Sequence, residues 1–145
     1  MPTRSHSALL PEVKRLSTLG RALAALQLVK ETLTVVLLGL PLLVQQPVLV
    51  PAVLPGLVLY LYRWGMVLGQ VPRRVARVVW VLTLLDEVWG LIIYHSVVNE
   101  PTARQLRYLT WSYGLGLTFT VAALAEIYLG QRRERRHLRA LLRAA

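Results

Sequence analysis

Two adjacent carboxylates, Asp86 and Glu87, lie near the middle of an apolar stretch that is long enough to cross a bilayer. A charged side chain at the centre of a membrane helix costs about 2.5–3.5 kcal/mol on insertion scales, so such a residue usually faces a protein interior or a water-filled cavity. A carboxyl group held there can pair with a cation, carry a proton or join two chains. The pair therefore marks its helix as the place where function is expected.

Arg63 is the basic residue that we expect to pair with this site. Counted at 1.5 Å per residue from Pro72, Asp86 lies roughly 16–20 Å and Arg63 roughly 13 Å into the membrane. The sequence predicts a pair between Arg63 and either Asp86 or Glu87, because buried charges persist mainly when they are paired. Extension of Arg63 to the headgroups is the alternative. The carboxylate left over must be protonated, face water, meet a partner chain or bind a cation.

The same helix carries further polar and small residues beside the carboxylates. A helical wheel places five of them on one broad face: Thr83, Asp86, Glu87, Gly90 and Tyr94. Such a stripe is typical of a binding or transport site, but it is equally typical of a seam where membrane helices pack together.

A second group of charges lies nearer the ends of the apolar stretches. Lys30 and Glu31 fall about two turns into the first stretch, and Glu126 falls about one turn from the end of the last. A pair between Lys30 and Glu126 would hold the first helix against the last. Extension of all three side chains to the headgroups explains them equally well, so they are assigned no chemistry.

The composition indicates an integral membrane protein. The chain has 145 residues, of which 55% are hydrophobic, and its mean hydropathy is +0.50. A net charge of +10 would suggest nucleic-acid binding in a soluble protein, but here the basic residues flank apolar blocks, where anionic lipid headgroups are the expected partners. The absence of cysteine excludes disulfides, thiolate metal sites and thiol redox chemistry by this chain.

Four apolar blocks are each long enough to cross about 30 Å of hydrocarbon. They cover residues 23–44, 48–69, 75–97 and 106–130. Because the connections are short, we expect an all-α, four-helix up-down bundle of antiparallel neighbours. Residues 1–22 and 131–145 are expected to form amphipathic extensions, the first an interfacial helix that is retained and leads into the first span.

The distribution of basic residues predicts the orientation. Lysine and arginine gather on the side of both termini, which the positive-inside rule places in the cytoplasm. Fifteen arginines against two lysines indicate a GC-rich genome, which bears on codon usage more than on mechanism. The expected location is a prokaryotic plasma membrane.

The C-terminal segment has the pattern of a basic amphipathic helix. Leucines at 138, 141 and 142 share one face, and the residues expected to meet anionic lipid are Arg132, Arg133, Arg136, Arg139 and Arg143. A helix on the leaflet surface and a solvated tail are equally favoured. An arm that docks on a partner is the third option.

Small residues predict where helices approach one another closely. Gly65 and Gly69 form a GxxxG pattern at the inner end of the second span, and a small-residue stripe follows the last span: Ser112, Gly116, Thr120 and Ala123. The spacing leaves open whether these contacts lie within the chain or join it to another subunit.

No enzyme and no cofactor are predicted. The chain has no HExxH, no GxSxG, no phosphate-binding glycine loop and no cluster with metal-ligand spacing. His95 is the single histidine in a span, whereas a haem between helices usually needs two axial ligands. His95 could therefore contribute at most one haem ligand, at a subunit interface.

Two functions follow from these observations. The favoured one is a non-enzymatic membrane protein that works by association, as an accessory or scaffolding subunit of a larger complex or as a homo-oligomer. The alternative is a small proton-coupled or cation-conducting transporter, in which Asp86 or Glu87 is the exchangeable carboxylate and Thr83 and Tyr94 line the path.

Overall fold

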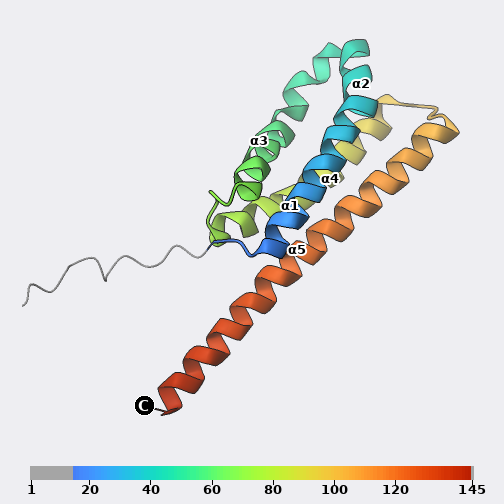
Figure 1. Ribbon diagram of the computed structural model, residues 1–145. Coiled ribbons are helices and arrows are strands. Elements are labelled where there is room, and N and C mark those ends of the chain that lie inside the picture. The colour runs from blue at the N-terminus through green and yellow to red at the C-terminus, as the bar shows by residue number, and fades with distance from the viewer. Residues whose placement is uncertain (1–14, 145) are drawn as a thin grey trace, which may run out of the picture.

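The computed structural model describes residues 15–144, which form an all-α protein that is 89% helical and without strands (Figure 1). Its elements follow in the order α1 (Thr18–Thr34), the π-helical η2 (Val35–Gly39), α2 (Leu40–Gln45), the 3₁₀-helical η3 (Pro47–Leu49), α3 (Val50–Val67), α4 (Arg73–Val97) and α5 (Ala103–Ala144). Residues 1–14, most of the predicted N-terminal extension, lie outside the described part.

The first three elements make one continuous helix of 28 residues, Thr18–Gln45. It begins where the Ser17 hydroxyl accepts a hydrogen bond from the Gly20 amide at 3.0 Å, a typical N-cap. Residues 18–22, which the sequence assigned to the extension, therefore belong to the first long helix. A π-turn precedes Pro41, whose ring nitrogen has no hydrogen to donate to the preceding turn.

The glycines of the GxxxG pattern shape the connection between α3 and α4. Gly69 has a φ of 73°, which favours glycine, and it allows the chain to reverse after α3. A Cβ on Gly65 would lie 2.9 Å from a Val71 methyl carbon, so this glycine makes room for the connection itself. At Gly69 a Cβ would lie 3.6–3.8 Å from the Arg21 guanidinium of α1, so of the two glycines Gly65 accommodates the turn and Gly69 lies beside the first helix.

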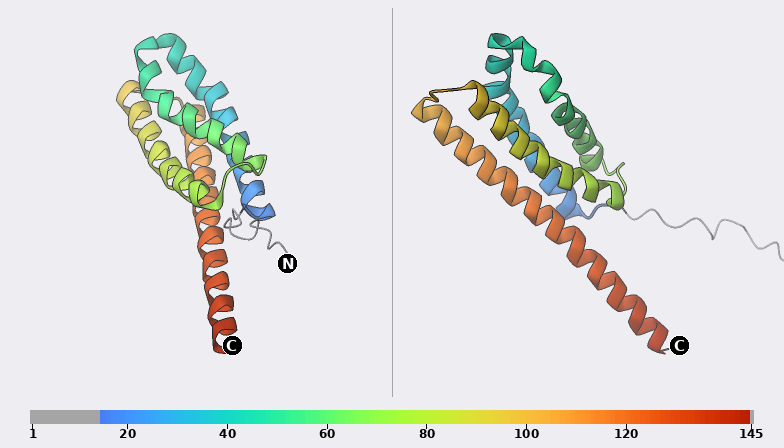
Figure 2. Two further views of the ribbon diagram at one scale, coloured as in Figure 1. Left: turned by 90° about the vertical axis from the view of Figure 1, so that its left-hand side faces the viewer. Right: turned by 180° about the vertical axis from the view of Figure 1, so that it is seen from behind.

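Each long helix packs against two others. α1 contacts α3 and α5, and α4 contacts the same two helices (Figures 1 and 2). The hydrophobic core gathers near the end at which α1 starts and α3 meets α4, which we call the basic end because Arg21, Arg73 and Arg77 lie there. Its largest fully buried apolar side chains are Trp80, Met66 and Ile127.

The outer faces of the helices carry many exposed large hydrophobic side chains. Three stretches are long and apolar enough to span a membrane: Thr18–Gln45, Pro47–Val67 and Ala103–Arg143. The charged α4 is not among them, although its 25 residues give a length of about 37 Å. Apolar surfaces on helices of this length are compatible with a membrane protein.

α5 has 42 residues and a length of about 63 Å, roughly twice the thickness of a hydrocarbon core. Its last part extends beyond the other helices as a straight arm (Figures 1 and 2). The predicted separate tail from residue 131 is thus a continuation of the same helix, because no proline or non-helical residue interrupts it. The contact of this segment with anionic lipid headgroups stays a prediction.

Candidate functional site

Five charged side chains from three helices lie close together. α1 supplies Lys30 and Glu31, α3 supplies Arg63, and α4 supplies Asp86 and Glu87. They amount to two cations and three anions. Since α1 packs on α3 and reaches α4, side chains far apart in the sequence meet between these helices.

Lys30 and Glu87 form the first ion pair of this network. The Lys30 Nζ lies 2.9 Å from a Glu87 carboxylate oxygen, and the two side chains are only 9% and 8% exposed. The fully buried Gln27 amide donates to the same oxygen at 2.7 Å. On α5, a Cβ at Gly116 would lie 2.6 Å from the Lys30 Nζ, and the Tyr113 ring centroid is 5.9 Å from that nitrogen. α5 therefore needs a glycine where it crosses the pair.

Arg63 and Glu31 form the second ion pair through the Arg63 Nη1. The Arg63 Nη2 donates to the Thr83 hydroxyl at 2.8 Å, and Thr83 donates in turn to the Val79 carbonyl at 2.7 Å. The Gln27 amide also donates to Glu31, at 3.0 Å, so it links the two pairs. Arg63 is only 1% exposed, which excludes the predicted alternative in which it extends to the surface.

The structure corrects both predicted ion pairs. Arg63 pairs with Glu31 and not with Asp86 or Glu87, and Lys30 pairs with Glu87 and not with Glu126. The sequence predicts partners on the adjoining helix of a hairpin and at equal depth. It does not show that α1 lies against α3 and close to α4, so that Glu31 pairs with Arg63 of α3 and Lys30 pairs with Glu87 of α4.

Two predicted site residues lie apart from the network. Tyr94 is two turns beyond Glu87 along α4, about 10 Å away, where its buried ring meets His95 edge-on. Glu126 lies near the basic end, with one carboxylate oxygen 3.3 Å from the position of a Cβ on Gly20. That oxygen is buried and has no hydrogen-bond partner among the described residues.

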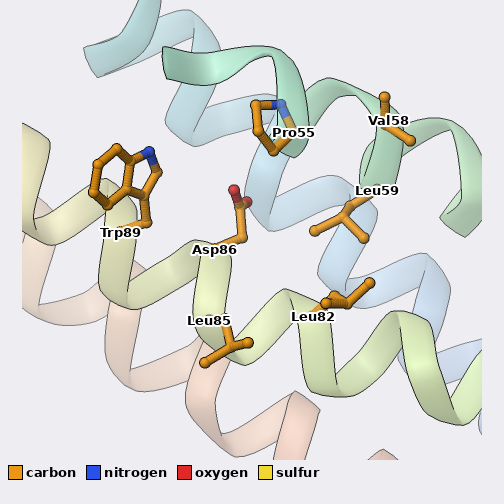
Figure 3. Close-up of a pocket in the computed structure, with 7 residues that line it drawn as sticks. All are labelled: Pro55, Val58, Leu59, Leu82, Leu85, Asp86 and Trp89. Atoms are coloured by element: carbon orange, nitrogen blue, oxygen red, sulfur yellow. The ribbon is translucent and has the colours of Figure 1, made fainter.

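Asp86 differs from the other four charges. It makes no hydrogen bond or ion pair with any residue between 15 and 143. Its attraction to Arg63 and Lys30 is electrostatic and acts at longer range. Its carboxylate points from α4 toward α3 (Figure 3), where a Cβ on Gly56 would lie 3.1 and 3.2 Å from the two oxygens. The absence of a side chain at Gly56 therefore lets the α3 backbone approach the carboxylate closely.

Asp86 lines an open groove of about 480 Å³ between α3 and α4 (Figure 3). The other lining residues are all apolar or aromatic: Pro55, Val58, Leu59, Leu82, Leu85 and Trp89. The Trp89 indole is fixed because its Nε1 donates to the Ala52 carbonyl at 3.1 Å. Leu85 is 60% exposed, so the groove lies on the outer surface of the protein.

The small-residue stripe of α5 is buried within the chain. Ser112, Thr120 and Ala123 are at most 4% exposed, and the Ser112 hydroxyl lies 2.7 Å from that of Thr34 on α1. These residues therefore serve the packing of α5 against its own neighbours. The arginines of the tail, in contrast, are exposed along the projecting arm: Arg132, Arg133, Arg136, Arg139 and Arg143.

Sequence reasoning missed Gln27 and Gly56. Gln27 precedes Glu31 by one helical turn, a spacing that could have indicated a hydrogen bond along the helix. Nothing in the sequence places Gly56 opposite Asp86. Within residues 15–143, no three His, Cys, Asp or Glu side chains are close enough to hold a metal ion.

No protein-family model, curated protein or solved structure matches this chain.

Proposed function

We propose that this chain is a non-enzymatic membrane protein with four spans, arranged as an up-down bundle with both termini in the cytoplasm, that works by associating with another membrane-embedded chain. The observation that carries this proposal is the unpaired Asp86 carboxylate in an apolar groove on the outer surface. A second copy of the chain and a different subunit are both partners of this kind.

The charge balance supports association. Two ion pairs join Lys30 to Glu87 and Arg63 to Glu31, which leaves the Asp86 carboxylate without an ion pair among the described residues. Asp86 lies about 20 Å along α4 from Arg73, close to mid-membrane depth in the proposed arrangement. Lipid tails supply neither water nor a cation there, so the carboxyl group must either be protonated or meet a group on another chain, and a cation on a partner satisfies its charged form.

The shape of the molecule supports association as well. The connections at 68–72 and 98–102 are short, which leaves little surface outside the bilayer for a reaction site. Of the three apolar stretches, the one that contains α3 is the least buried, with 11% of its most apolar part covered by the rest of the protein. One side of the groove is therefore a helix with most of its surface free for a partner.

Replacing Asp86 with asparagine is expected to release the partner without unfolding the protein. Asp86 has no ion pair to lose, so the free energy of unfolding should change by less than about 1 kcal/mol. The measurement is native mass spectrometry of the complex released from its own membranes in a mild detergent. A matched control is Glu100→Gln, which removes an exposed carboxylate from the connection between α4 and α5. An unchanged stoichiometry in the Asp86 variant would contradict the proposal.

A second candidate, proton-coupled transport, is favoured by buried polar atoms without partners. Six such atoms have no hydrogen-bond partner among the described residues: Gln27 Oε1, Arg63 Nε, Trp80 Nε1, Tyr94 Oη, Thr120 Oγ1 and Glu126 Oε2. Buried groups of this kind are commonly satisfied by internal water, which can also relay protons. They lie within the charge network and on both sides of it along the helices.

For the transport candidate, vesicles containing the protein should show proton flux that is lost when Asp86 and Glu87 are both replaced by their amides. The measurement is a pH-sensitive dye trapped inside the vesicles, with an imposed gradient. The Glu100→Gln variant should keep the full flux, since that carboxylate lies in the exposed connection. If the double amide variant moves protons as fast as the parent chain, this candidate is wrong.

A further inference from the structure

We infer that the groove at Asp86 receives a transmembrane helix of another chain that carries one lysine or arginine near mid-membrane depth. This inference rests on the proposed association function and names the chemistry of the partner. It is based on the direction of the Asp86 carboxylate, the apolar walls of the groove and the fact that Asp86 is the one charged residue among the described residues that line it.

A cation can approach Asp86 along the groove between α3 and α4 (Figure 3). On the α3 side, Gly56 lets the helix backbone come close to the carboxylate, whose two oxygens would lie 3.1 and 3.2 Å from a Cβ at this position. A larger residue there would push α3 or the carboxylate aside. The Trp89 indole stands beside the carboxylate, and an aromatic ring adds attraction for an ammonium or guanidinium group.

The walls of the groove fit the surface of a helix. On α4 they run from Leu82 to Trp89, about 10 Å or two helical turns, and on α3 from Pro55 to Leu59. The exposed apolar side chains continue past the groove on the same helices, at Val78 and Ile92 of α4. A neighbouring helix could therefore pack along this strip with a single basic residue opposite Asp86.

The chemistry of the groove disfavours a bare metal ion. Calcium binds six to eight oxygen ligands and magnesium needs near-octahedral coordination, whereas the groove offers the carboxylate of one side chain. Every other lining side chain is apolar or aromatic. A lysine or arginine needs one carboxylate and covers the apolar walls with its stem and its helix.

The inference is tested with a synthetic transmembrane peptide of about 22 leucines and alanines and one central lysine. A unique fluorescent label on the protein is available through Asn99→Cys, because the chain has no cysteine and this residue is exposed. Energy transfer to the labelled peptide is titrated in vesicles, against the same peptide with leucine in place of lysine. The expected result is half-saturation at roughly tenfold lower peptide density for the lysine peptide.

Three variants make the peptide result specific. Asp86→Asn should abolish the preference for lysine, whereas Glu100→Gln should keep it. Asp86→Lys should reverse the preference, so that a peptide with a central glutamate binds better than the lysine peptide. This reversal does not depend on the behaviour of the asparagine variant.

Three results would overturn the inference. One is equal binding of the lysine and leucine peptides by the parent chain. Another is a lysine preference that survives Asp86→Asn. The third is Asp86-dependent binding of tetraphenylphosphonium without binding of the lysine peptide, which would assign the groove to a small organic cation. The association proposal is judged separately, from the native complex: if that complex needs Asp86 but no lysine preference is found, only the basic-residue assignment fails.

Discussion

Replacing Glu87 with leucine is expected to lower the free energy of unfolding by about 3–5 kcal/mol. The substitution leaves the ammonium group of Lys30 without an anion in a site where this side chain is only 9% exposed. It also removes the acceptor for the Gln27 amide at 2.7 Å. A single buried charge without a partner costs far more than the intact pair contributes, so the loss exceeds that of an ordinary surface substitution.

The measurement is equilibrium unfolding in mixed micelles of a mild detergent and dodecyl sulfate. The matched control is the same substitution one residue earlier, Asp86→Leu, which removes an unpaired carboxylate from an apolar groove and should be neutral or stabilising. The double variant Lys30→Met with Glu87→Leu should recover most of the lost stability, because it removes both charges together. Equal costs at positions 86 and 87 would contradict the pairing seen in the structure.

Replacing Gly116 with valine is expected to lower the free energy of unfolding by about 3 kcal/mol or more. A Cβ at this position would contact Glu87 and lie 2.6 Å from the Lys30 Nζ. The added side chain must push α5 away or separate the ion pair, and overpacking alone costs about 1–3 kcal/mol. The loss of the pair adds to that cost.

A control for this effect lies two residues away on the same helix. Gly114 is exposed, and a Cβ there would meet nothing within 4 Å. Gly114→Val should change the free energy of unfolding by less than about 1 kcal/mol in the same titration. If the two valine variants unfolded alike, α5 would not be packed against the Lys30–Glu87 pair.

The first pair of substitutions separates folding from association. Glu87 is an internal residue whose removal should affect stability, whereas Asp86 lines the groove between α3 and α4, and its removal should affect the partner. A conventional double substitution of both carboxylates would mix these effects. Testing them one at a time therefore decides whether a loss of function comes from an unfolded protein or from a lost contact.

The sequence by itself was sufficient for the helical class and for the regions in which function was sought. Apolar blocks predict helices because a chain in lipid must satisfy its backbone polar groups internally. Charges within those blocks are costly, so Asp86, Glu87, Arg63 and Lys30 stood out by composition alone. The small residues of α5 also indicated the buried face of that helix, because closely packed helices need small side chains.

Only the tertiary structure decided which charges meet. Residue numbers give the depth of a side chain along its helix, but adjacent residues point about 100° apart around it. Lys30 therefore reaches Glu87 on α4 while its neighbour Glu31 reaches Arg63 on α3. The same rotation buries Glu87 and turns Asp86 toward the outer groove, over Gly56. Which helix stands at each angle is set by the packing of the whole chain, and local sequence does not carry that information.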